Sequence, residues 1–275
     1  MSLFKWNVDL APPLKLSPWR KIAMGSWRTA KDPSVYGTMD VDVQVCLDHI
    51  EELNKNSNGI KITITHLVGK AIANCLAKHP DINSVLRLGR LYPRKSVDIF
   101  FQVATDTKGV DLSGAVIRHA DKKSILEIAK EMQDEVTKVR HKGDPNFKKT
   151  KNTMKFIPGF LVACVLDILG FVLYGLNIWS PLLGTPRDTF GSVMVTNVGS
   201  LGLGLSFAPL LPYSRVPVLF ALSAIEDKPI VKGGQIVIAP VIQIGVTIDH
   251  RVIDGVHGGH MAKTLRNFFA NPSSL

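Results

Sequence analysis

The sequence is poor in cysteine, and its three cysteines are far apart. Cys46, Cys75 and Cys164 lie in apolar surroundings, and their odd number and wide spacing favour buried free thiols in a reducing compartment. The sequence has no Cys-x-x-Cys pair and no His/Cys cluster, so it predicts no metal site. The opening residues, MSLFKWNV, lack the apolar region of a secretory signal. We therefore expect a cytoplasmic protein without a metal.

Acidic side chains are fewer than basic ones. Lys and Arg number 33 against 23 Asp and Glu, which gives a formal net charge of +10 and a pI near 9.5. The excess is typical either of simple solubility or of an anionic partner, such as a phosphorylated cofactor, an acidic membrane surface or nucleic acid. Aromatic residues are not interleaved with the basic ones, which argues against nucleic acid.

The end of an alternating apolar run carries the first candidate catalytic group. Residues 236–248 have the spacing of a strand, His250 follows at its end, and residues 261–269 have helical spacing. A neutral imidazole in such a loop can take a proton from a hydroxyl or thiol, because its pKa lies close to neutral pH. A lone histidine is more often structural, so its interpretation depends on the surrounding motif. Here the motif is Asp-His-Arg-Val-Ile-Asp-Gly, residues 249–255.

This motif resembles the His-x-x-x-Asp-Gly signature shared by the acyltransferase component of 2-oxoacid dehydrogenase complexes and by chloramphenicol acetyltransferase. Further blocks resemble that family in the same order, over roughly residues 14–150 and 188–275. One departure is Ala115, where the family usually has proline. The blocks are Arg-Lys-Ile-Ala at 20–23, Val-Asp-Val at 41–43, Lys-Ile-Thr at 61–63, Lys-His-Pro at 78–80, Asp-Lys-Lys-Ser at 121–124 and Thr-Asn-Val-Gly at 196–199.

The resemblance implies an α/β (α+β) fold, a mixed-sheet two-layer structure similar to chloramphenicol acetyltransferase. It also implies a homotrimer or a larger homo-oligomer, with each active site between two subunits. Residues 1–16 are then expected to form an N-terminal arm, and residues 17–275 a catalytic domain that is interrupted by an apolar insert at 156–184.

The resemblance also implies a reaction, in which coenzyme A as acyl-CoA exchanges an acyl group with a thiol or other acceptor. His250 is expected to be the general base that deprotonates the thiol, and Thr196 the hydroxyl that stabilises the oxyanion. Bound coenzyme A carries several phosphate charges, which gives the basic excess a use.

Three further residues are expected to support this site. Asp254, in the same catalytic motif, is expected to shape the loop by pairing with an arginine, either Arg20 or Arg251. Gly255 is expected to allow the tight turn after it. Asn197 belongs to the Thr-Asn-Val-Gly block and is expected to give structural support to the site.

Residues 156–184 depart from the family pattern, because they contain a single charge, Asp167, among 29 residues. The length suffices for a bilayer span, but a single pass would separate two halves of one domain. We therefore expect a hairpin or monotopic contact with a membrane, or an apolar contact with another subunit. The sequence also shows no lipoyl motif, so we expect no lipoyl group on this chain. The alternative function is a non-catalytic scaffold or membrane-associated assembly protein that keeps the fold.

Overall fold

The computed structural model describes residues 5–15, 33–104, 112–142, 158–183 and 185–275. The Ser-Pro pair at 17–18 predicts a helix over residues 17–24, with Arg20 in it, and residues 105–110 predict a turn, but both segments lie outside the described residues.

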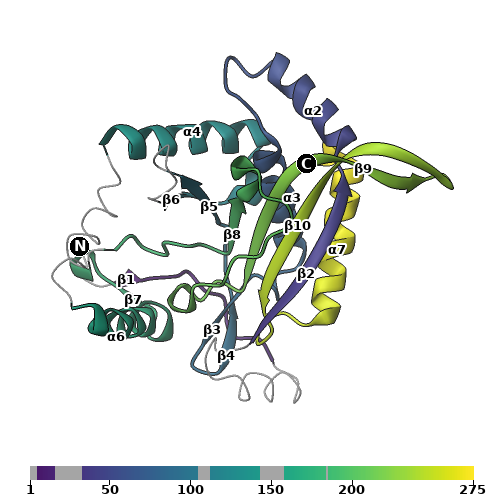
Figure 1. Cartoon of the computed structure of the whole chain (residues 1–275). Helices are drawn as coiled ribbons and strands as arrows, with labels where there is room; N and C mark the ends of the chain where they lie inside the picture. The colour runs from purple at the N-terminus through teal and green to yellow at the C-terminus, as the bar shows by residue number, and fades with distance from the viewer. Residues whose placement is uncertain (1–4, 16–32, 105–111, 143–157, 184) are drawn as a thin grey trace.

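A mixed six-stranded sheet forms the centre of the molecule, in the order β2-β10-β9-β8-β5-β6 (Figure 1). β8 is parallel to both of its neighbours, β5 and β9, and the other pairs are antiparallel. The α/β mixed-sheet fold expected from the sequence is thereby confirmed. The strands are Ser34–Asp42 (β2), Ile99–Ala104 (β5), Leu112–Ile117 (β6), Val193–Asn197 (β8), Val218–Lys232 (β9) and Gln235–Asp249 (β10).

Four helices cover one face of this sheet, and their apolar sides form the main core with it. α3 is buried along most of its length, because its apolar positions recur on the side that faces β5. A Cβ at Gly69 would overlap the ring of Phe101, so glycine permits this close approach of helix and strand. The helices are Gln44–Lys55 (α2), Ile64–Lys78 (α3), Ile125–Lys142 (α4) and Gly255–Ala270 (α7).

The opposite face of the sheet is crossed by the chain between β8 and β9, which includes the 3-10 turns Val198–Leu201 (η4) and Pro212–Ser214 (η5). A second apolar cluster joins this connection to the strands, with Phe100, Met194 and Leu219 buried in it. A Cβ at Gly199 would overlap the backbone of Ser223. The glycine of the Thr-Asn-Val-Gly block therefore lets the connection lie directly on β9.

The apolar segment after residue 157 folds onto the N-terminal arm. Helix α6 (Gly159–Gly170) runs into a π-helical turn, η2 (Phe171–Gly175), followed by β7 (Ile178–Trp179) and a 3-10 turn, η3 (Pro181–Leu183). β7 pairs with β1 (Lys5–Trp6), and Leu173 and Tyr174 pack against Val8 and Val85. Val85 lies in the hairpin of β3 (Ser84–Arg87) and β4 (Arg90–Pro93). No helix within the described ranges is both long and apolar enough to cross a membrane.

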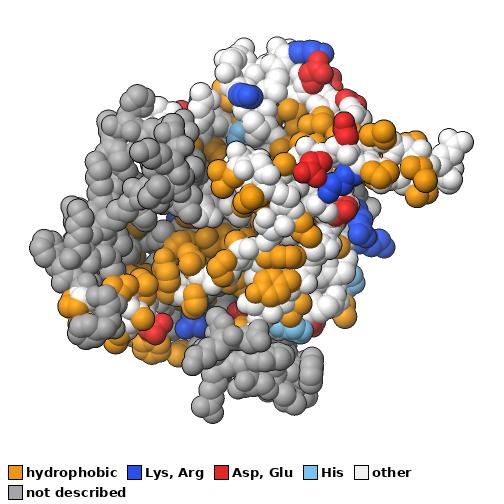
Figure 2. All heavy atoms as spheres, viewed as in Figure 1, with side chains coloured by type: hydrophobic (Ala, Val, Ile, Leu, Met, Phe, Trp, Pro, Cys, Tyr) orange, Lys and Arg blue, Asp and Glu red, His pale blue; other side chains and the backbone are white. Residues whose placement is uncertain are grey.

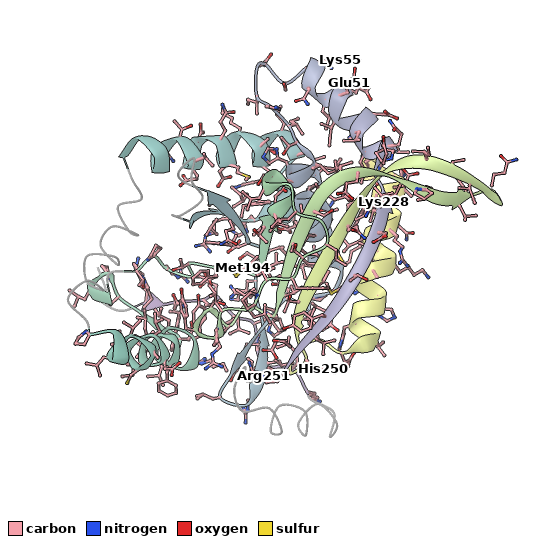
Figure 3. The ribbon with its side chains drawn as sticks, viewed as in Figure 1. Glu51, Lys55, Met194, Lys228, His250 and Arg251 are labelled. Carbon is pink, nitrogen blue, oxygen red and sulfur yellow. The ribbon has the colours of Figure 1, made fainter. Side chains whose placement is uncertain are left out.

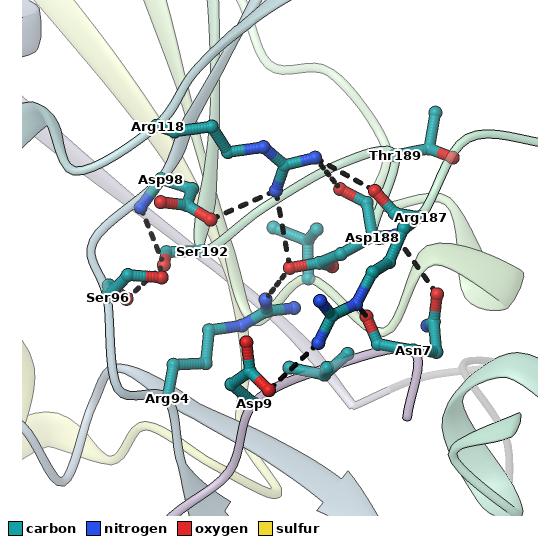
Figure 4. A network of polar contacts seen from close by, with 12 residues as sticks. Asn7, Asp9, Arg94, Ser96, Asp98, Arg118, Arg187, Asp188, Thr189 and Ser192 are labelled. Atoms are coloured by element: carbon teal, nitrogen blue, oxygen red, sulfur yellow. Dashed lines mark hydrogen bonds and ion pairs between the residues drawn. The ribbon is translucent and has the colours of Figure 1, made fainter. Parts of the chain in front are cut away.

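A buried ionic network fixes the point where this segment rejoins the sheet (Figure 4). Arg94 donates to Asp188 over 2.5 Å, and Arg118 lies 2.9 Å from Asp98 and 3.6 Å from Asp188. Burial opposes the charge of Arg94, but the adjacent Asp188 outweighs it, and the pKa of Arg94 is raised. The side chain of Asn7 accepts a hydrogen bond from the Asp188 amide (3.0 Å), which brings the arm into the network.

Three local predictions from sequence pattern are wrong. Residues 226–229 have the composition of a connection between strands, but they lie inside β9, where Pro229 pairs with Ile238 in the outer part of a long hairpin. Asp121 is by residue type a good helix cap, but it lies in a 3-10 turn, and Ser124 caps α4 by exchanging hydrogen bonds with Glu127. The alternation of residues 36–45 predicts one strand, but β2 ends at Asp42 and helix α2 begins at Gln44.

Candidate active site

His250 is the residue directly after β10, and the backbone on both sides of it is fixed. Its amide donates to the carbonyl of Pro33 (2.7 Å), and the amide of Asp249 donates to that of Pro217 (2.8 Å). The Asp249 carbonyl then accepts the amides of Val252 and Ile253, both at 2.9 Å. The side chains of these two residues are buried in the main core. The histidine therefore lies on a short loop that is held at both ends (Figure 3).

An ion pair brackets the histidine in sequence. Arg251 Nε lies 2.9 Å and 3.2 Å from the two carboxylate oxygens of Asp249, and its Nη2 lies 2.7 Å from Oδ2. Both residues are buried. Arg215 is close enough that Arg251, after burial, lowers its pKa. A bidentate pair between the neighbours on either side restricts the backbone at His250.

Asp254 begins α7 as its N-cap. Its Oδ1 accepts the amides of Val256 and His257, both at 3.1 Å. The His257 ring closes a capping box, since its Nδ1 lies 3.3 Å from the Asp254 amide and 2.8 Å from Oδ1. The other ring nitrogen, Nε2, lies 3.0 Å from Asp81 in the turn after α3. The role of His257 was missed by the sequence analysis.

Two expectations for this loop stay predictions. Gly255 is the first residue of α7, its φ is outside the left-handed region, and a Cβ there would meet nothing within 4 Å, so its expected part in the turn rests on the motif alone. Arg251 forms its ion pair with Asp249, while Arg20 is outside the described residues, so an arginine paired with Asp254 stays a prediction.

Thr196 lies at the end of β8, beside Gln102 on β5 and Ala221 on β9. Its side chain is on the same face of the sheet as Met194, two residues earlier, and is partly buried. The next residue, Asn197, donates from Nδ2 to the Thr65 hydroxyl on α3 (2.7 Å) and accepts the Ser200 amide (3.1 Å). Asn197 thereby fixes the strand end that carries Thr196.

The structure does not bring His250 and Thr196 together within one chain. Thr196 is level with Ala221, which pairs with Gly245, and His250 lies five residues further along β10. With two strand spacings across and five residues along, their Cα atoms are about 19 Å apart. Each residue is at the C-terminal end of its strand, as expected. Because β8 and β10 run in opposite directions, these two strand ends lie at opposite ends of the sheet.

The titratable side chains of His66, Cys46 and Cys75 are buried in the fold. Burial lowers the pKa of His66 to about 4, and its Nδ1 accepts the Thr63 amide at the start of α3. Burial raises the pKa of Cys46 to about 11 and that of Cys75 to about 12, so both thiols are inert. The expected burial is wrong for Cys164, which is exposed on α6. In the part of the chain that the structure describes, His, Cys, Asp and Glu form no group of three or more that could hold a metal ion.

The fold of this chain is similar to that of known acetyltransferase structures. A dihydrolipoamide acetyltransferase from Azotobacter vinelandii superposes with a TM-score of 0.66 at 20% identity, covering 96% of this chain and 99% of that one. One from Listeria monocytogenes, described as a probable dihydrolipoamide acetyltransferase, gives 0.65 at 18% identity and 94% coverage of both chains. A chloramphenicol acetyltransferase gives 0.54 at 14% identity, covering 91% and 94%.

The chain belongs to the family described as 2-oxoacid dehydrogenases acyltransferase (catalytic domain), whose profile matches residues 14–146 and 185–275. It is 28% identical over 267 residues to the dihydrolipoyllysine-residue acetyltransferase component of the pyruvate dehydrogenase complex from Staphylococcus epidermidis. That alignment covers 95% of this chain and 52% of the relative. A Staphylococcus aureus relative of the same description is 28% identical over 259 residues, with 93% and 50% covered. The chain thus spans about half the length of the curated relatives it matches.

Proposed function

We propose that this protein transfers an acyl group between coenzyme A and a thiol acceptor, with His250 as general base and Thr196 as oxyanion donor. The observation that carries the proposal is the rigid placement of His250 after β10, between the buried Asp249–Arg251 pair and the capped start of α7. In the Azotobacter vinelandii relative, a serine, a histidine and an asparagine four residues after the histidine were studied for their role in the catalytic mechanism. His250 and Asp254 have the same spacing.

The proposed reaction follows from the chemistry of these two side chains. Neutral His250 takes the proton of the attacking thiol, whose pKa near 8.5 is within reach of an imidazole base. The thiolate sulfur then bonds to the thioester carbon, and the Thr196 hydroxyl donates a hydrogen bond to the resulting oxyanion. As the tetrahedral intermediate collapses, the original C–S bond breaks and the leaving thiolate takes the proton back from His250. No bond to the protein forms.

The distance between His250 and Thr196 in one chain supports a site shared by two copies. About 19 Å is too far for both groups to contact one reacting carbonyl, so we propose that Thr196 of a neighbouring subunit completes each site in a homotrimer. Two apolar surfaces are available for such contacts (Figure 2). On the protruding β9–β10 hairpin, Val231, Ile236 and Ile238 are 74–78% exposed, and on the connection over the sheet Leu201, Leu203, Leu205 and Phe207 are exposed.

The first test is calorimetric titration of the purified protein with acetyl-CoA, combined with an assay of acetyl transfer to free dihydrolipoamide. We expect wild type to bind and turn over, and His250→Ala to bind but lose turnover by at least about 100-fold. His49→Ala, a substitution on α2 outside the proposed site, serves as the matched control and keeps wild-type rates. Binding without turnover in wild type would point to a different acceptor, and absence of binding would refute the enzyme proposal.

The second candidate function, a membrane-associated or purely structural assembly protein, is favoured by one observation. On α6 and η2, Leu161, Ile168 and Phe171 are exposed in one stripe, at 41%, 59% and 48%. Such a stripe fits either an anionic membrane surface or an apolar face of another subunit. Cosedimentation with anionic vesicles, using wild type and Ile168→Glu, separates the two. Lipid binding that the substitution abolishes supports the membrane. Absence of lipid binding, together with an oligomer that Ile168→Glu disrupts, supports the subunit contact. The expected cytoplasmic location stays a prediction.

A further inference from the structure

We propose that His257 is a positioning residue for the candidate base, acting as a bridge between Asp254 and Asp81. This inference rests on the proposed function, and it assigns a role to a residue outside the His-x-x-x-Asp-Gly motif. Its two ring nitrogens contact two different segments, Nδ1 the N-cap of α7 (2.8 Å to Asp254 Oδ1) and Nε2 the turn after α3 (3.0 Å to Asp81 Oδ2). The side chains of His257 and Asp254 are 23% and 26% exposed and that of Asp81 is 46% exposed, so the contact with Asp254 is the better shielded from water.

The protonation chemistry of the ring suits a bridge. With one proton, on Nε2, the ring donates to Asp81 while Nδ1 accepts the Asp254 amide, which completes the capping box. With a second proton, on Nδ1, the ring donates to the Asp254 carboxylate as well. In both states the imidazole ties Asp254 to Asp81, and only the Asp254 atom that it contacts changes.

The bridge acts on the base because Asp254 ends the loop that begins with His250. One end of that loop is fixed by β10 and the Asp249 carbonyl. The other end is fixed by Asp254, whose carboxylate is held by two backbone amides and by the His257 ring. Asp81 lies in the turn after α3, so the bridge ties the end of the catalytic loop to the C-terminal end of α3.

Further contacts join α7 to the C-terminal end of α3 and form one seam with the His257–Asp81 contact. His79, at the end of α3, lies 3.1 Å from the Thr264 hydroxyl and stacks on His260 at 6.1 Å between ring centroids. These contacts hold the middle of α7 to α3. His257–Asp81 is the contact of this seam that reaches the first turn of α7, where Asp254 lies.

A double-mutant cycle tests the bridge through kcat and KM. We expect His257→Ala and Asp81→Ala each to lower kcat about tenfold with KM for acetyl-CoA within about twofold, because a small displacement of a catalytic loop costs rate rather than affinity. We expect the double variant to be no slower than His257→Ala, since one bridge is lost in each case. Lys263→Ala, at an exposed position further along α7, is the matched control and keeps wild-type kcat. The proposal would be overturned if the fold-losses in kcat of the two single variants multiplied in the double variant, or if Asp81→Ala left kcat unchanged.

Hydrogen exchange gives a readout that does not depend on activity. The Val256 and His257 amides donate to Asp254, so they should exchange several-fold faster in Asp81→Ala, although that substitution leaves the cap itself intact. Unchanged exchange at both amides would refute the bridge. If wild type shows no acyl transfer at all, the proposed function fails, while the exchange experiment still decides whether the bridge exists.

Discussion

A hydroxyl at position 196 is the group that the proposed mechanism needs for the oxyanion. We expect Thr196→Val, which keeps the shape of the side chain on β8, to lower kcat by about 100- to 1,000-fold, the usual effect of removing one oxyanion donor. Thr196→Ser keeps the hydroxyl and should stay within a few-fold of wild type. Steady-state acetyl transfer measures both. Equal activity of the valine and serine variants would exclude Thr196 as the donor.

Buried His66 makes stability depend on pH. Its pKa is lowered by burial to about 4 in the folded chain, against about 6.5 when unfolded. Between these two pKa values, His66 is protonated in the unfolded chain and neutral in the folded chain. The free energy of unfolding therefore decreases as the pH falls from about 6.5 towards 4. Between pH 7 and pH 4.5 we expect a loss of about 2–3 kcal/mol from this group.

The measurement is urea unfolding at both pH values for wild type and His66→Asn. The asparagine oxygen can still accept the Thr63 amide at the start of α3 but does not titrate. The variant should therefore lose less stability on acidification than wild type, and an identical loss in both proteins would contradict the assignment.

At the scale of single residues, the sequence predicted the positions of side chains that belong to a local motif. His250 was predicted from its position between an alternating run and a helix, and the structure places it directly after β10. The link between His257 and Asp81 could not be predicted, because it joins the first turn of α7 to the turn after α3, and their proximity depends on how the two helices pack. The backbone conformation at Gly255 could not be predicted either, since a motif glycine suggests a left-handed turn position, whereas Gly255 begins α7 with φ outside that region.

Among the elements, β7 and the arm are held by one side chain that completes their pairing. Asn177, in the left-handed region at φ 58°, accepts the Val8 amide through Oδ1 (2.7 Å) and donates to the Val8 carbonyl through Nδ2 (3.0 Å). The amide thus continues the short β1–β7 ladder by one more pair of hydrogen bonds. Asparagine is one of the few residues that tolerate this backbone conformation.

We expect Asn177→Ala to destabilise the fold by about 2–4 kcal/mol, because two buried backbone groups lose their partners and alanine is strained at this φ. Asn177→Gly loses the same hydrogen bonds without the strain and should be about 1 kcal/mol less destabilised than the alanine variant. Thermal or denaturant unfolding of the three proteins measures both differences. A glycine variant as unstable as the alanine one would remove strain from the explanation.

The sequence predicted elements well where one periodicity runs undisturbed. The apolar face of α3 and the alternation of β10 are of this kind. β9 was cut short because Glu226-Asp227-Lys228-Pro229 has the composition of a turn, although Pro229 lies in a hairpin that extends beyond the core. The segment after residue 157 was recognised as apolar, but its shape depends on contacts with residues 5–10, which no local pattern encodes.

For the whole molecule, a shared active site predicts that two inactive variants complement each other. His250→Ala supplies an intact Thr196, and Thr196→Val supplies an intact His250. In a randomly mixed trimer with a head-to-tail interface, about a quarter of the sites would combine the two intact residues. Mixing the variants after reversible dissociation should therefore restore roughly that fraction of wild-type turnover. Activity that stays at the level of the separate variants would place both residues in one subunit's site.

The proposed oligomer has a testable surface. Ile236 and Ile238 are each 78% exposed on the protruding hairpin. Large apolar side chains exposed together in this way typically mark a contact surface. We expect Ile236→Glu with Ile238→Lys to reduce the assembly to monomers and abolish turnover, with the unfolding temperature of the domain shifted by only a few degrees. Sedimentation gives the mass, and a double variant that remains trimeric would exclude the hairpin from the interface.

The edge strand β2 belongs to the first part of the chain, yet its neighbour in the sheet is β10, which runs up to Asp249. During synthesis on the ribosome, residues 34–42 must therefore wait for some 200 further residues before their ladder can close. Throughout that interval β2 is an unpaired edge, and long-range pairing of this kind is slow. Its exposed Val35 and Tyr36 are then open to other nascent chains. Yield in a cell should consequently depend on translation speed and on chaperones that shield the first fifty residues.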